Sequence, residues 1–293
     1  MLIRVFTILF PVFAIIAIGY FYARRHPVDM SIANRINLEV FTPCLLFSIL
    51  ADKSFNLNEY YQLAIVALLL VLGSGILMLP IVYWLKLNAK TFIPSMMFAN
   101  TGNMGLPVAY FAFGQDIMPA AVVLFIVSNA LHFTVGSYIM NHHTNWWSIL
   151  KKPMILATLS GIILSFFKIS VPPLLLEPLK MLGQISVPLM LFALGVRLIN
   201  VNLADWEIGL RGAIWCPLSG VLVLAAALPF LTFTPEQTGL VLIYAMLPPA
   251  VMNYMIAEQY QQEPQKVASI VMLGNLMSFV TMPLALLLAL PAS

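Results

Sequence analysis

The chain has 293 residues, of which 61% are hydrophobic and only 9% are charged. A soluble protein carries about 25% charged residues, so this composition excludes an ordinary soluble domain and indicates a protein that faces the lipid bilayer. The net charge of +3 is modest and the basic residues are scattered along the chain, which argues against a nucleic-acid partner.

The hydropathy pattern predicts an all-α membrane protein with ten transmembrane helices, because a helix needs about 20 apolar residues to cross the hydrocarbon. The expected spans are 2–23, 32–51, 61–85, 92–113, 117–140, 149–168, 174–199, 208–230, 237–260 and 265–290. The first is longer than a signal-peptide core, so we expect it to be retained. Cys44 and Cys216 show no metal-binding or redox spacing and are expected to be packing thiols.

Related segments occur in both halves of the chain, separated by about 146 residues. Residues 42–47 (TPCLLF) recur as residues 187–192 (VPLMLF), and residues 128–133 (SNALHF) recur as residues 274–279 (GNLMSF). The spacing predicts an internal duplication that covers the whole sequence.

We therefore expect a first five-helix repeat in residues 1–146 and a second in residues 147–293. Because five is odd, the second repeat would enter the membrane inverted, which is an architecture of secondary transporters. Ten of the 14 lysines and arginines, Arg197 among them, fall on one side of this topology. The positive-inside rule places that side in the cytoplasm and both termini outside.

The fourth and ninth expected spans contain residues that interrupt a helix. The fourth contains Asn100, Thr101, Gly102, Asn103, Gly105 and Pro107. The ninth contains Pro248, Pro249, Asn253 and Tyr254. Proline removes a backbone donor and glycine lowers the free energy needed to unwind a helix. The pattern predicts that helices 4 and 9 are broken and cross near the middle of the membrane, and a simple kink at each proline is the alternative.

Two matching breaks in inverted repeats indicate a transport site, because each break leaves a half-helix N-terminus inside the membrane. Such an N-terminus carries about half a positive charge and free N–H donors, which suit a carboxylate. Asn100, Asn103 and Asn253 can add uncharged hydrogen bonds. The residues of both breaks therefore form the predicted substrate-binding site for a small organic anion.

Further polar residues lie in otherwise apolar spans. Asn129 and Asn275 occupy equivalent positions, and they could either tie their helices to the broken neighbours or line the site. His132 shares a helix face with Asn129 and is a candidate for proton coupling or a packed hydrogen-bonding group. Glu258, near the end of the ninth span, is a second coupling candidate unless it is simply solvated.

Three segments together resemble the auxin efflux carrier family across essentially the whole chain: residues 98–107 (FANTGNMGLP), residues 186–195 (SVPLMLFALG) and residues 248–260. Bacterial members of the family resemble malonate or malate permeases. The resemblance places the protein in a bacterial inner membrane and implies a fold similar to bile acid/sodium symporters. It carries a binding role onto Asn100, Asn103, Pro107, Pro248 and Pro249.

In such a fold, helices 1, 2, 6 and 7 form a scaffold, often dimeric, and helices 3–5 and 8–10 form a transport domain that moves like an elevator. We expect a homodimer through helices 2 and 7, whose Pro43 and Pro188 lie in a segment poor in polar groups. The prediction is a secondary transporter, not an enzyme, with no metal and no cofactor. A sodium-coupled symporter and a non-transporting membrane sensor are the alternatives.

Overall fold

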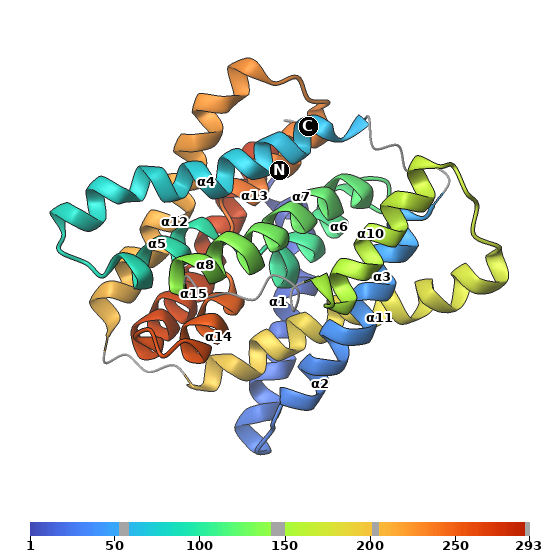
Figure 1. The fold of residues 1–293 in the computed structure, drawn as a ribbon. Coiled ribbons are helices and arrows are strands. Elements are labelled where there is room, and N and C mark those ends of the chain that lie inside the picture. Colours follow the sequence, from blue (N-terminus) through green and yellow to red (C-terminus); the bar gives the residue numbers. More distant parts are fainter. Residues whose placement is uncertain (53–58, 142–149, 201–204, 291–293) are drawn as a thin grey trace.

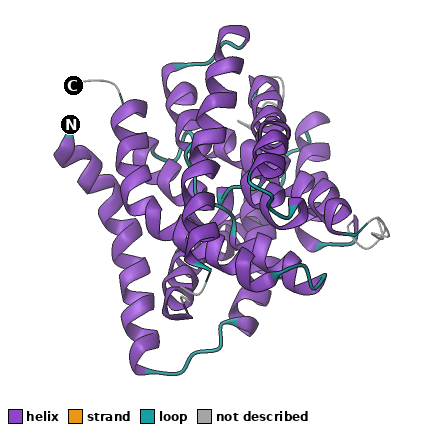
Figure 2. Ribbon diagram, turned by 90° about the vertical axis from the view of Figure 1, so that its left-hand side faces the viewer, coloured by secondary structure: helices purple, strands orange, loops and turns teal. Residues whose placement is uncertain are grey.

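The computed structural model describes residues 1–52, 59–141, 150–200 and 205–290, and within these ranges it is helical with one isolated β-bridge, between Ala99 and Pro249 (Figure 1). The boundary expected between the two repeats, at residues 146 and 147, lies outside the described residues. The first turn of α1 and the last turn of α15 lie at the same end of the molecule (Figure 2).

The helices of the first half are α1 (Leu2–Arg25), α2 (Ser31–Ile36), α3 (Thr42–Leu50), α4 (Tyr61–Trp84), α5 (Ala89–Met97), α6 (Leu106–Phe113), α7 (Met118–Leu131) and α8 (Ser137–Met140). Three π-helical segments interrupt them, at Asn37–Phe41, Thr101–Gly105 and His132–Gly136. The helices of the second half are α10 (Pro153–Phe166), α11 (Pro173–Arg197), α12 (Trp206–Ala227), α13 (Pro235–Ala245), α14 (Val251–Gln259) and α15 (Pro264–Ala289). Short 3₁₀ turns follow α11 and α12, at Leu198–Asn200 and Leu228–Phe230.

Six helical segments are long and apolar enough to cross a membrane: Leu2–Arg25, Tyr61–Trp84, Met118–Met140, Pro173–Arg197, Trp206–Phe230 and Pro264–Ala289. The other four expected spans coincide with α2–α3, α5–α6, α10 and α13–α14, which are shorter or interrupted. The structure is thus that of an all-α protein with apolar spanning helices, and the ten-span inverted repeat stays a prediction.

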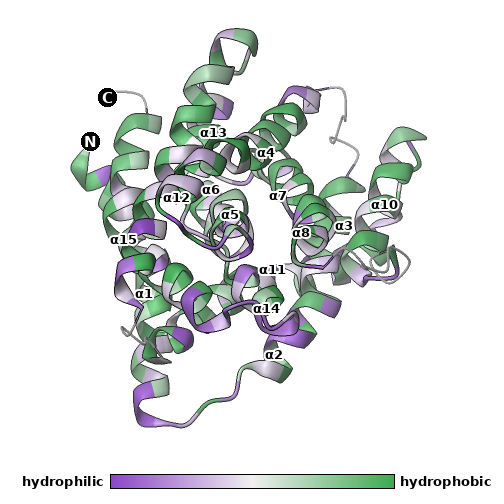
Figure 3. Ribbon diagram, turned by 60° about the vertical axis from the view of Figure 1, so that its left-hand side comes forward, coloured by the Kyte–Doolittle hydropathy of each residue, from purple (hydrophilic) through white to green (hydrophobic). Residues whose placement is uncertain are grey.

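The outer surface is rich in large hydrophobic side chains, such as Ile3, Tyr83 and Leu174, each more than 80% exposed. Figure 3 shows hydrophobic residues over most of the helices, whereas hydrophilic stretches gather around α14, α2 and the end of α1 that leads to α2. Such a surface is stable against lipid tails but not against water.

The helices pack in two groups. The first group consists of α1, α3, α10 and α11, and the second of α4 to α7 with α12 to α15. Within the first group, a Cβ atom on Gly195 would lie 2.0 Å from the Ile16 carbonyl oxygen, so only glycine allows α1 and α11 to approach this closely. The buried hydroxyls of Thr42 and Ser186, 2.9 Å apart, tie α3 to α11.

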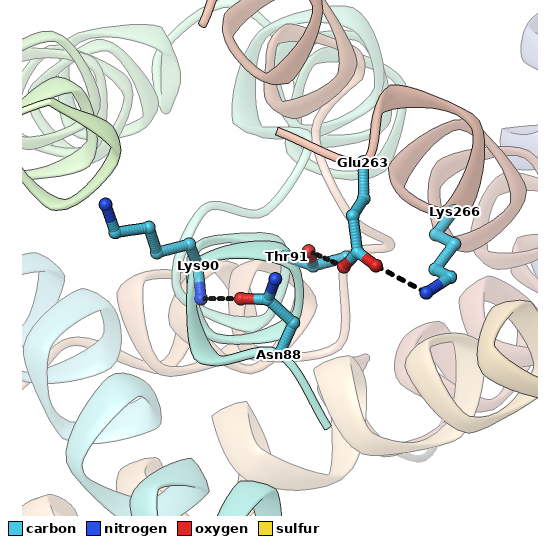
Figure 4. A network of polar contacts seen from close by, with 5 residues as sticks. All are labelled: Asn88, Lys90, Thr91, Glu263 and Lys266. Carbon is cyan, nitrogen blue, oxygen red and sulfur yellow. Dashed lines mark hydrogen bonds and ion pairs between the residues drawn. The ribbon is translucent and has the colours of Figure 1, made fainter. Parts of the chain in front are cut away.

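A polar network joins the start of α5 to the start of α15 at one end of the second group (Figure 4). Glu263, in a left-handed backbone conformation just before α15, accepts hydrogen bonds from Thr91 of α5 and from Lys266. Asn88 caps α5 by accepting a hydrogen bond from the Lys90 N–H at 3.0 Å. The Glu263 carboxylate is stabilised here because both helices present their N-termini, where negative charge is favourable.

This network should make stability depend on pH in the acid range. The hydrogen bond from Lys266, and then that from Thr91, hold the pKa of Glu263 below its ordinary value of 4.5. A lowered folded-state pKa stabilises the fold fully above the unfolded-state pKa, and this contribution falls as the pH drops through the folded-state pKa. We expect Glu263→Gln to remove that part of the acid dependence in thermal unfolding of detergent-purified protein. Glu236→Gln, at an exposed position on α13, should retain it.

Candidate functional site

The two broken helices meet through their connecting segments, which run antiparallel. The Asn100 N–H donates to the Pro248 carbonyl at 2.7 Å, and the Ala250 N–H donates to the Phe98 carbonyl at 2.8 Å. The structure confirms both predicted breaks, because α5 ends at Met97 and α13 ends at Ala245. We call this pair of segments, residues 98–100 and 248–250, the crossing.

The local sequence explains the crossing. Pro248 and Pro249 have no N–H groups, so they cannot donate the hydrogen bonds that would continue α13. Because the helix ends here, their backbone oxygens have no helical N–H partner and must accept from another segment. Unpaired backbone groups are tolerated at membrane depth only where protein or a cavity satisfies them, and here the segment of the other half does so. Pro107 lies in the first turn of α6, directly after the π-helical segment Thr101–Gly105, where it cannot donate a hydrogen bond to the preceding turn.

Three buried asparagines reinforce the crossing. The Asn100 Nδ2 donates to the Asn275 Oδ1 at 2.9 Å, and the Asn275 Nδ2 donates to the Pro249 carbonyl at 3.1 Å. The Asn253 Nδ2 donates to the Phe98 carbonyl at 2.9 Å. Asn129 and Asn275 each donate to the carbonyl four residues earlier in their own helix, but only Asn275 also bonds to the crossing. Of the two roles considered for this symmetric pair, Asn275 ties its helix to the crossing.

A cavity of about 90 Å³ lies beside the crossing, between the two helix groups. A water needs roughly 10–15 Å³ of such space, so several waters or a small organic molecule fit. The lining includes six of the predicted site residues: Asn100, Thr101, Gly102, Asn103, Asn129 and His132. The other predicted residues do not belong to the lining: Gly105, Pro107, Pro248, Pro249, Asn253, Tyr254, Glu258 and Asn275.

Two half-helix N-termini reach this cavity. Gly102 and Asn103 begin the helical stretch that leads into α6, and Val251 and Met252 begin α14. Among the described residues, the backbone N–H groups of these four residues have no hydrogen-bond partner. The cavity wall therefore offers four unsatisfied donors at the positive ends of two helix dipoles, an arrangement that favours an anion.

All three π-helical segments of the described chain contribute to the cavity wall. Asn37, Gly102 and His132 are examples, one from each segment. In the segment at the crossing, the Asn100 carbonyl accepts from the N–H groups of both Met104 and Gly105, at 3.3 and 3.0 Å. Single π-helical turns occur often at functional sites, which supports a binding role for this cavity.

His132 is buried and stacks on Phe98, with ring centroids 4.0 Å apart and planes 5° from parallel. The ring lies near the Asn253 side chain. The Asn253 Oδ1 itself is buried and makes no hydrogen bond within the described residues. The neutral His132 imidazole carries one N–H donor, so a suitably oriented ring can supply a hydrogen bond to this oxygen. Proton coupling by His132 stays a prediction.

A family model described as "Membrane transport protein" matches residues 4–145 and 139–286, nearly the whole chain. The chain belongs to this family of membrane transport proteins. The match confirms the resemblance to the auxin efflux carrier family. The protein is therefore a membrane transporter by family, and its apolar helices indicate an integral membrane protein.

Two proteins similar to this chain carry transporter names. A "Putative malonate transporter" of Rhizobium meliloti is 25% identical over 293 aligned residues, which cover 92% of this chain and 91% of the relative. An "Uncharacterized transporter" of Methanocaldococcus jannaschii is 24% identical over 299 aligned residues, covering 93% and 95%. Both are similar along nearly their full lengths, so the comparison concerns the whole fold and not one motif.

Sequence reasoning missed part of this transporter's cavity wall. Asn34 and Asn37, from the start of the second span, and Arg197, from the end of α11, all line the cavity. The spacing of Asn34 and Asn37 places them on one helix face, which was an available signal. Arg197 gave no separate signal, because an arginine at a cytoplasmic helix end is already explained by topology.

Proposed function

We propose that this membrane transporter is a secondary carrier of a small organic anion, and that the anion is a carboxylate. The observation that carries the proposal is the set of unsatisfied N–H groups of Gly102, Asn103, Val251 and Met252 at one cavity. A carboxylate accepts several hydrogen bonds and is stabilised at helix N-termini. The relative named as a malonate transporter makes malonate the first compound to test.

The packing supports an elevator mechanism. The first helix group contains the predicted scaffold helices 1, 2, 6 and 7, and the crossing belongs to the second group. Since the cavity lies between the groups, a shift of the second group against the first would carry the crossing toward the opposite membrane face. The cavity lining includes Asn34 of α2 and Met255 of α14, on the side that is expected in the cytoplasm. Under this mechanism, the structure corresponds to an inward-facing state.

Uptake into proteoliposomes tests this function. We expect labelled malonate to enter vesicles that contain the protein, and labelled choline, a cation of similar size, to be excluded. Imposed pH and sodium gradients then decide the coupling. If a pH gradient stimulates malonate uptake and this stimulation is lost in His132→Gln or Glu258→Gln, the carrier is coupled to protons. If a sodium gradient stimulates uptake, the sodium symporter alternative is favoured. Binding without uptake of any carboxylate would contradict a carrier and favour a sensor.

The inverted ten-span topology makes a separate prediction for intact cells. With Cys44 and Cys216 replaced by serine, a cysteine at Leu2 should react with a membrane-impermeant thiol reagent from outside. A cysteine at Gln261, in the exposed turn between α14 and α15, should react only after the cells are opened. The physical reason is the lysine and arginine imbalance between the two sides. Labelling of both positions from the same side would reject the model of ten spans.

The expected homodimer uses helices 2 and 7, which correspond to α3 and α11. Large apolar side chains on α11, such as Leu174 and Met181, are exposed and available for a second copy or for lipid. We expect cysteines placed along this face to crosslink two protomers without stopping uptake, because the scaffold stays fixed while the transport domain moves. Crosslinks that form only along α5 or α14 would contradict this assignment.

A further inference from the structure

Arg197 is the last residue of α11 and lines the cavity from the side of the first helix group. Its side chain is half-buried, yet among the described residues it makes no hydrogen bond and no ion pair within 4 Å. Tyr254 and Glu258 of α14 interact with it electrostatically, although neither residue belongs to the cavity lining. The Tyr254 hydroxyl donates to the Glu258 Oε1 at 2.7 Å, so that carboxylate is already partly satisfied.

The rest of the cavity wall gives Arg197 a distinct chemical role. Among the described residues, the other polar side chains of the lining are amides, hydroxyls and the His132 imidazole, and none of them is acidic. Within this part of the chain, Arg197 is thus the one permanently charged group of the lining. A half-buried guanidinium has five N–H donors in a planar fork and is stabilised when a carboxylate accepts from two of them.

A second and independent observation points to a ligand at the same place. Asn37 also lines the cavity, is 4% exposed, and has a buried Oδ1 without a hydrogen-bond partner in the described chain. The amide can present its oxygen or, turned over, its NH₂ group. A buried amide with unused hydrogen-bonding capacity, in the same cavity lining as an unpaired arginine, is typical of a binding site that is completed by its ligand.

We propose that Arg197 binds the anionic group of the substrate and that Glu258 is the counter-charge that the substrate displaces. This inference rests on the proposed function and adds the residue that selects for charge. Arg197 and Glu258 belong to different helix groups, so a substrate carboxylate bound by Arg197 would replace an electrostatic interaction between the groups. A merely topological arginine at a helix end needs no place on the cavity wall.

The test is binding of labelled malonate to the purified full-length protein in lipid nanodiscs. Loss of a charge-assisted hydrogen bond predicts that Arg197→Gln weakens binding about 10- to 150-fold. Arg197→Lys, which keeps the charge and the topology but not the fork, should weaken it less. Glu258→Gln removes the competing charge and should strengthen binding about 2- to 5-fold. In the Arg197→Gln background, Glu258→Gln should change nothing further, because the competition is gone.

Arg211 and Glu207 provide the matched controls, because they form an exposed pair on α12, 3.8 Å apart, away from the cavity. Arg211→Gln and Glu207→Gln should bind malonate like the wild type. If Arg197→Gln binds malonate within a factor of two of the wild type, this inference is overturned while the proposed function stands. A Glu258→Gln variant that binds malonate as weakly as Arg197→Gln would also overturn this inference. If the wild type binds neither malonate nor any other small carboxylate, the proposed function fails and this inference with it. Should Arg197→Gln fail to insert, the opposite changes expected for Arg197→Lys and Glu258→Gln still decide the question.

Discussion

Asn103→Asp is expected to lower the uptake of a small carboxylate by about 1000-fold. Asn103 lines the cavity in the π-helical segment after the crossing, half-buried, at the N-terminus that leads into α6. Two like charges about 4 Å apart repel by about 4 kcal/mol at the effective dielectric constant near a protein surface. Every 1.4 kcal/mol corresponds to a factor of ten. Asn103→Ala only removes a donor to a charged ligand, so we expect a smaller loss of about 10- to 150-fold.

The order of the two variants is the informative result. If the transported molecule is a cation, aspartate should be tolerated or should improve uptake, while alanine should still impair it. Gln115→Glu adds the same negative charge at an exposed position between α6 and α7 and should leave uptake unchanged. Protein level and membrane insertion are measured alongside. Near-normal uptake by both Asn103 variants would remove this residue from the site.

The parts of this site that could be predicted are those with a local chemical cause. Pro248 and Pro249 cannot donate backbone hydrogen bonds wherever they lie, and Gly102 and Gly105 weaken a helix in any context. The breaks in the fourth and ninth spans could therefore be predicted from the sequence, and the structure confirms them. That the two connecting segments then pair with each other is a consequence of the need to satisfy backbone groups inside a membrane.

The cavity wall opposite the crossing could not be predicted in this way. Asn37 and Arg197 approach the crossing only because α3 and α11 pack together and lean against the second helix group. The local sequence does not predict which helices become neighbours. Arg197 gives no further signal, because its position already fits the positive-inside pattern. Gly195, two residues before Arg197, shows how strongly tertiary packing acts here, since its contact with Ile16 of α1 leaves no room for a side chain.

Asn129 and Asn275 show a different limit, because they are equivalent in sequence and unequal in structure. Asn129 is followed by the π-helical segment His132–Gly136, whereas Asn275 lies within the continuous helix α15. A π-helical turn adds a residue and rotates the later turns of its helix relative to those of a regular helix. The helices therefore differ in geometry after these asparagines, and of the two residues only Asn275 makes hydrogen bonds with the crossing.

The different hydrogen bonds of Asn129 and Asn275 predict that their alanine variants differ strongly in free energy of unfolding. Asn275→Ala removes the acceptor of the Asn100 Nδ2 and the donor to the Pro249 carbonyl, both buried. Each buried group left unsatisfied costs about 1–3 kcal/mol, so we expect the free energy of unfolding to fall by about 2–6 kcal/mol. Asn129→Ala removes only a bond to a carbonyl of its own helix and should cost less than about 1 kcal/mol.

Unfolding of the detergent-purified protein by denaturant measures both losses, and Asn275→Leu separates the two causes that alanine combines. Leucine fills a similar volume but makes no hydrogen bonds. If the hydrogen bonds to the crossing are responsible, the Asn275→Leu protein should be destabilised at least as strongly as the Asn275→Ala protein. If leucine restores the wild-type stability, the role of Asn275 is packing. Equal small losses for Asn275→Ala and Asn129→Ala would show that the crossing holds without this amide. Its pairing would then rest on the backbone bonds of Asn100 and Ala250 and on the Asn253 side chain.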